Sequence, residues 1–149
     1  MRKFKFNLEA LLKLRNEQET AAKLQLAEAQ QVVHLIDEQI EALEQQRISD
    51  EDSLADQKSK GFRADDLAAS MLYLDKLRTQ ILSLQDERLR ALNTVQQRRQ
   101  EVAKAMQERK TIDRLKEKKH AEWEAEYRRA EKNFLDEQAT MRYLQNRGG

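Results

Sequence analysis

Apolar residues along the first part of the chain recur at alternating steps of four and three, the spacing of the a and d positions in a coiled coil. A helix brings residues with this spacing onto one narrow face, called the seam below. The pattern predicts one long helix over about residues 4–57. The seam positions are Leu8, Leu12, Arg15, Glu19, Ala22, Leu26, Ala29, Val33, Ile36, Ile40 and Leu43, followed more weakly by Arg47, Asp50 and Leu54.

A second seam with the same spacing predicts a second helix over about residues 65–146. Its positions are Leu67, Met71, Leu74, Leu77, Ile81, Leu84, Arg88, Ala91, Val95, Arg98, Val102, Ala105, Arg109 and Ile112. The phase shifts near Lys116 and Lys119, which marks a change of supercoil or the end of one packing partner. A new stripe then follows, with Trp123, Tyr127, Ala130, Phe134, Met141 and Leu144.

Gly61 is the only glycine inside the chain, and there is no proline. We predict a turn over about residues 58–64, because glycine readily adopts the positive φ that follows a helix end. The predicted fold class is all-α: one domain over residues 1–149, with two long helices in an antiparallel coiled-coil hairpin. Folding the chain here pairs Leu43 with Leu77. The second helix is longer, so residues from about Ala121 onward should overhang as a single helix.

Four arginines occupy seam positions where an apolar residue would stabilise the pair most: Arg15, Arg88, Arg98 and Arg109. One interpretation is that their aliphatic stems lie along the seam while the guanidinium groups reach neighbouring carboxylates. The other is a soft coiled coil that can bend or change register. The two interpretations are compatible.

The composition agrees with a coiled coil, because 37% of the 149 residues are charged and only 5% are aromatic. Acidic and basic residues are interspersed and leave a net charge of +1, so we expect no nucleic-acid partner. The absence of cysteine excludes disulfides and thiolate chemistry. We recognise neither a secretory signal nor a membrane span, and therefore expect a cytoplasmic protein.

The residues offer little catalytic chemistry. His34 and His120 each stand alone, without a second histidine at the spacing that builds a metal site on a helix. The carboxylates lie on solvated faces, where nothing shifts a pKa for acid–base work. We therefore predict no catalytic residues, no cofactor, no metal and no enzymatic activity.

The densest positive stretch is Lys110–Lys119, and the hairpin brings Arg2, Lys3 and Lys5 back beside it. A solvated helix face is one explanation for these charges. Docking to an acidic protein ring or to an anionic membrane surface is the other.

Three segments resemble the FliJ family of flagellar export proteins. They are the opening Phe4-Lys5-Phe6-Asn7-Leu8, the turn region with Gly61, Leu67, Tyr73, Leu77 and Ile81, and the tail Phe134-Leu135-Asp136-Glu137-Gln138-Ala139-Thr140-Met141-Arg142. The resemblance covers the whole chain. It implies a stalk-like coiled coil of the flagellar type III export apparatus that binds and stimulates the hexameric export ATPase. It also implies contact with the cytoplasmic domain of the export gate and escort of export chaperones.

The resemblance also suggests which residues meet each partner. The positions that match the family's gate-binding patch are Gln39, Leu43, Tyr73 and Leu77, and relatives often carry aromatic residues where this chain has Gln46 and Asp50. The end that faces the ATPase ring would present Phe4, Phe6, Lys118, Lys119, Trp123 and Tyr127. Leu43 and Leu77 are also seam positions, so a purely structural role is an alternative for them.

Two other functions fit the same pattern. One is the stalk of a virulence-type III secretion system, and the other is a coiled-coil chaperone or spacer without an ATPase partner. The resemblance favours the flagellar role, at the cytoplasmic face of the inner membrane, where any membrane association would be indirect. The aromatic stripe leaves self-association open.

Overall fold

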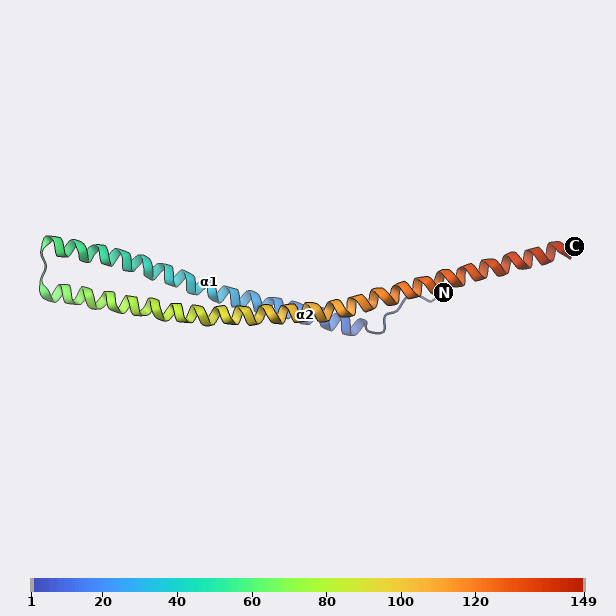
Figure 1. The fold of residues 1–149 in the computed structure, drawn as a ribbon, viewed down its shortest axis with the longest axis horizontal. Coiled ribbons are helices and arrows are strands. Elements are labelled where there is room, and N and C mark those ends of the chain that lie inside the picture. Colours follow the sequence, from blue (N-terminus) through green and yellow to red (C-terminus); the bar gives the residue numbers. More distant parts are fainter. Residues whose placement is uncertain (1, 149) are drawn as a thin grey trace. The chain divides into compact units, whose positions relative to one another are not determined.

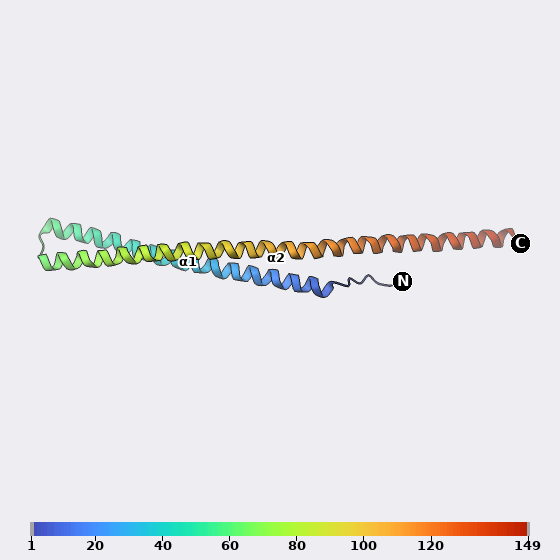
Figure 2. The same cartoon turned by 60° about the horizontal axis from the view of Figure 1, so that its bottom comes forward.

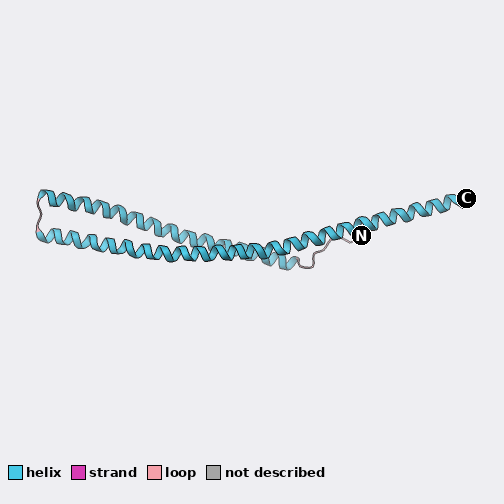
Figure 3. Cartoon of the chain, viewed as in Figure 1, coloured by secondary structure: helices cyan, strands magenta, loops and turns pink. Residues whose placement is uncertain are grey.

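The computed structural model describes residues 2–148, which form two helices, α1 (Glu9–Lys60) and α2 (Ala64–Arg147), and no strand (Figure 1, Figure 3). The predicted all-α class and two-helix hairpin are confirmed. The first helix was expected from about residue 4 but begins at Glu9, whose N–H donates to the carbonyl of Phe6 at 3.2 Å. Residues 2–8, named the strap below, are not helical.

The turn consists of residues 61–63 and is shorter than predicted. Gly61 has a φ of +92°, which side chains disfavour, so the glycine is required by the backbone conformation at this point. Arg63 then starts α2 by accepting from the N–H of Leu67 at 3.0 Å. Asp65 and Asp66 lie in the first turn of α2, where negative charge stabilises the helix dipole.

The chain divides into two compact units, and both helices run through each of them. Unit 2 extends from Thr20 to Ala103 and contains the turn, with α1 and α2 side by side in both views of the ribbon (Figure 1, Figure 2). Its buried core consists of Ala29, Ile36, Leu74, Leu77, Ile81 and Val95.

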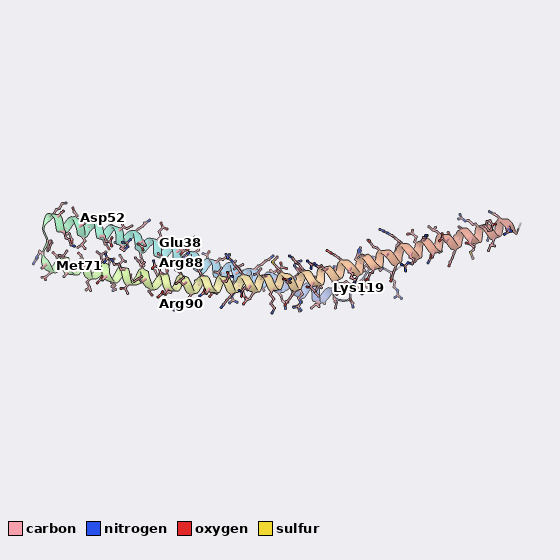
Figure 4. The ribbon with its side chains drawn as sticks, viewed as in Figure 1. Glu38, Asp52, Met71, Arg88, Arg90 and Lys119 are labelled. Atoms are coloured by element: carbon pink, nitrogen blue, oxygen red, sulfur yellow. The ribbon has the colours of Figure 1, made fainter. Side chains whose placement is uncertain are left out.

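The predicted seams match the burial pattern of unit 2 closely. In α1, every predicted seam position of this unit is buried or half-buried. In α2 the exception is Met71, which was expected to face inward but is 50% exposed, while Ser70 is half-buried instead. Figure 4 shows Met71 close to the turn, where α2 has only begun to pack against α1.

The hydrogen bonds that join the two helices of unit 2 are displaced from the predicted register, by an amount that differs along the pair. The seams place Glu51 opposite Ser70, but Glu51 accepts from the guanidinium of Arg78 at 2.9 Å. The hydroxyl of Ser70 instead donates to the amide oxygen of Gln57 at 3.4 Å. Two regular seams keep their apolar faces together in several registers, so periodicity does not select among them.

Unit 1 combines the residues up to Glu19 with those from Lys104 onward. Its buried residues are Phe6, Leu12, Glu19 and Ala105. In α2, Trp123 is half-buried, and every described residue beyond it is exposed. The predicted single-helix overhang is therefore confirmed. None of the described helices has a stretch long and apolar enough to span a lipid bilayer.

The seam arginines behave as the snorkelling interpretation predicts. Arg15 reaches Glu108 at 3.2 Å, and Arg88 donates to Asp37 at 2.5 Å. Figure 4 shows Arg88 between the two helices of unit 2. The remaining pairs join Arg98 to Glu101, and Arg109 to both Asp113 and the buried Glu19.

Candidate docking surfaces

The strap lies against α2 through an aromatic cluster in unit 1. The ring of Phe4 meets His120 edge-on, with centroids 4.8 Å apart, and lies 6.1 Å from the ring of Trp123. Tyr127 extends the cluster along α2, at 5.5 Å from Trp123. Phe6 is 8% exposed and anchors the strap next to the start of α1. The alternation of lysine and phenylalanine explains the arrangement, because alternate residues of an extended segment point to the same side.

A cleft of about 890 Å³ opens between the strap and α2. Its basic side chains are Arg2, Lys3, Lys5 and Lys119, and the acidic ones are Glu122 and Glu126. Lys119 lies 3.7 Å from Glu122, and Figure 4 places Lys119 on α2. The surface therefore combines exposed cations with an aromatic floor at Trp123, which suits a partner that offers both acidic and apolar groups.

The structure brings together five of the six residues that the family resemblance assigns to the ATPase ring. Phe4, Phe6, Lys119 and Trp123 line the cleft, and Tyr127 lies on the exposed side of Trp123. Lys118 is exposed on the same turn of α2 but does not line the cleft. Sequence reasoning missed His120 as a member of the aromatic cluster, because a histidine in a basic segment carries no distinct signal.

In unit 2, one edge of the helix pair carries the ion pairs that join α1 to α2. The central carboxylate is Glu51, which accepts from both Arg47 and Arg78. Hydrogen bonds from Arg78 and then from Arg47 hold the pKa of Glu51 below its ordinary value. The hydrogen bonds that Arg47 donates to Glu44 and then to Glu51 raise the pKa of Arg47 above its ordinary value. In both ion pairs that join the helices here, the carboxylate lies on α1 and the arginine lies on α2.

The opposite edge of unit 2 is almost uncharged. In a coiled coil this edge is formed by the residue before each a position. The a positions in question are Val33, Ile40, Arg47 and Leu54 in α1, and Leu74, Ile81, Arg88 and Val95 in α2. In the central part of this edge the residues before them are exposed and only Glu87 is charged, whereas Asp66 and Glu101 add charge towards its ends; the central residues are Val32, Gln39, Gln46, Ser53, Tyr73, Gln80, Glu87 and Thr94. A surface of this kind suits a partner segment that is itself uncharged and apolar or amide-rich.

Two of the four predicted gate residues belong to this uncharged edge. Gln39 is exposed, and Tyr73 is 52% exposed. Leu43 is half-buried, whereas Leu77 is 3% exposed and belongs to the core of the hairpin. Leu77 can therefore support a gate surface from beneath but offers little area of its own.

Within residues 2–148, no three metal-ligating side chains lie together. The fold is a two-helix hairpin whose specific features lie along exposed stripes of the helices. Among family models, the one described as Flagellar FliJ protein matches residues 4–148. The chain belongs to this family, and is therefore a component of the flagellar type III export apparatus. No curated protein and no solved structure matches it.

Proposed function

We propose that the protein is the stalk of the flagellar export machinery, which binds the hexameric export ATPase and stimulates its activity without being an enzyme itself. The observation that carries this proposal is the family match over nearly the whole chain, combined with an aromatic and basic surface in unit 1. Trp123, Tyr127, Lys118 and Lys119 supply the contacts from α2, with Phe4 and Phe6 beside them. The protein would act in the cytoplasm, and reach the inner membrane only through the apparatus.

Binding to the purified ATPase hexamer tests this surface. We expect Tyr127→Ala to weaken binding about tenfold or more, because an exposed tyrosine beside a tryptophan has the features of an interface hot spot. Tyr143→Ala is the matched control, since Tyr143 is also exposed on α2 and lies under the guanidinium of Arg147. Equal losses for the two variants would remove Tyr127 from the contact.

The uncharged edge of unit 2 is the proposed contact with the cytoplasmic domain of the export gate. Tyr73 and Gln39 supply its exposed groups, and Leu43 and Leu77 support them from the seam. Escort of export chaperones completes the proposed role, and its only support is the family match.

Tyr73→Ala should weaken capture of the gate domain and leave the helical circular dichroism unchanged, because Tyr73 is exposed. Leu72→Ala is the control, since Leu72 is more exposed and lies outside the uncharged edge. Unchanged capture by Tyr73→Ala would remove this residue from the gate surface.

A further inference from the structure

Two phenylalanine side chains of the strap line its cleft with α2. Phe6 is buried, and Phe4 contacts His120 and Trp123. No backbone hydrogen bond joins the strap to α2 within the described chain; its nearest one runs from Glu9 back to Phe6. The attachment thus depends on apolar contact and lacks the hydrogen-bond ladder that would fix an extended segment to a neighbour.

The charges of the strap do not strengthen this attachment. Arg2, Lys3 and Lys5 form no ion pair with any residue that the structure describes. On the α2 side the cleft carries Lys119 together with Glu122 and Glu126, and Glu122 is paired with Lys119. The conformational entropy gained on release therefore offsets most of the free energy that holds the strap in place.

Phe4 of the strap lies next to Trp123, the first residue of the aromatic stripe. Trp123 is half-buried beneath Phe4, while Tyr127 and Phe134 further along the stripe are exposed. Phe4 therefore occupies the position that an apolar side chain of a partner would take if the partner bound along the whole stripe. A partner that uses Trp123 has to compete with Phe4.

We propose that the strap is a displaceable cover, and that Phe4 leaves Trp123 when an apolar side chain of the ATPase ring takes its place. This inference rests on the proposed function, in which the ring binds this surface. Two states follow. In the free protein the strap covers Trp123, and in the complex the strap is released with its three cations and Trp123 contacts the ring.

A covering role and a contact role for Phe4 predict opposite changes in the affinity for the ATPase ring. If Phe4 only contacted the ring, its removal would weaken binding. If Phe4 covers the site, its removal strengthens binding, because the site is then uncovered in all molecules and not only in a fraction of them. We expect Phe4→Ala to lower the dissociation constant about three- to tenfold, as for a surface uncovered in about a tenth to a third of the molecules.

Trp123 reports the position of the strap directly, because it is the only tryptophan in the chain. In the free protein, Phe4→Ala should shift the Trp123 emission to longer wavelength and increase its quenching by acrylamide. Phe62→Ala is the matched control, since Phe62 is an exposed phenylalanine in the turn. Its emission and ring affinity should equal those of the wild type. Identical quenching in Phe4→Ala and wild type would show that the strap does not cover Trp123 and would overturn the proposal.

A reversible tether supplies the opposite perturbation. The chain has no cysteine, so Lys3→Cys and Glu126→Cys, which both line the cleft, can be joined uniquely by a cleavable bis-maleimide linker. The tethered protein should bind the ATPase hexamer more weakly, and cleavage of the linker should restore the affinity.

Equal affinity before and after cleavage, or weaker binding by Phe4→Ala, would overturn the cover and leave the proposed function intact. A wild-type protein that does not bind the hexamer would overturn the proposed function, and the cover with it. The quenching of Trp123 in the free protein separates these cases, since it needs no partner.

Discussion

Leu77 lies both in the hairpin core and among the predicted gate residues, and its replacement by alanine separates these roles. The side chain is 3% exposed, so the change removes buried methyl groups and leaves a cavity. Deletions of this kind cost about 2–5 kcal/mol in protein cores. A two-helix seam can collapse and admits water at its edges, so we expect the lower end, about 2–3 kcal/mol.

Urea unfolding, followed by circular dichroism at the helical minimum, measures this loss. Met71→Ala is the matched control, because Met71 lies on the same helix but is 50% exposed; we expect it to change the free energy of unfolding by about 0.5 kcal/mol or less. Equal losses for the two variants would refute the burial argument. Gate capture, measured under conditions where Leu77→Ala is still folded, should remain close to that of the wild type.

Two further predictions concern the charged positions of unit 2. Arg88→Leu should raise the urea midpoint, because the ion pair with Asp37 is about two-fifths exposed on each side and contributes little, whereas a leucine fills a seam position; a lower midpoint would contradict this. Glu51→Gln should make unfolding less sensitive to acid. The pKa of Glu51 is lowered in the folded state, so its contribution to the stability of the fold is present above the unfolded pKa of 4.5 and is lost as the pH falls below it. Thermal midpoints between about pH 6 and 3 measure this effect, and an unchanged pH dependence in Glu51→Gln would count against it.

Much of the fold could be predicted from the sequence, because a heptad seam and a single interior glycine leave few alternatives. Gly61 was expected to carry the turn, and its φ of +92° shows why no other residue type fits as well. The register could not be predicted, since regular seams mesh at several offsets. The pairing of Glu51 with Arg78, which departs from the predicted register, involves side chains outside the seams.

The candidate surfaces were predicted less completely. The residues of the aromatic cluster were expected at one end of the hairpin, but the extended strap was not, because the helical pattern was continued through Phe4 and Phe6. The alternation of lysine and phenylalanine over residues 3–6 is the signal that could have indicated an extended segment. For the gate, the seam pattern already set Leu77 apart from Tyr73, and their exposed fractions of 3% and 52% agree with it.

The central claim is that this chain stimulates the flagellar export ATPase, and steady-state ATP hydrolysis tests it most directly. The purified hexamer is titrated with the wild-type protein, with Tyr127→Ala and with Tyr143→Ala. We expect hydrolysis to rise to a plateau with the wild type and Tyr143→Ala, and the curve for Tyr127→Ala to shift to higher concentration. No increase at an excess of the wild-type protein would contradict the account.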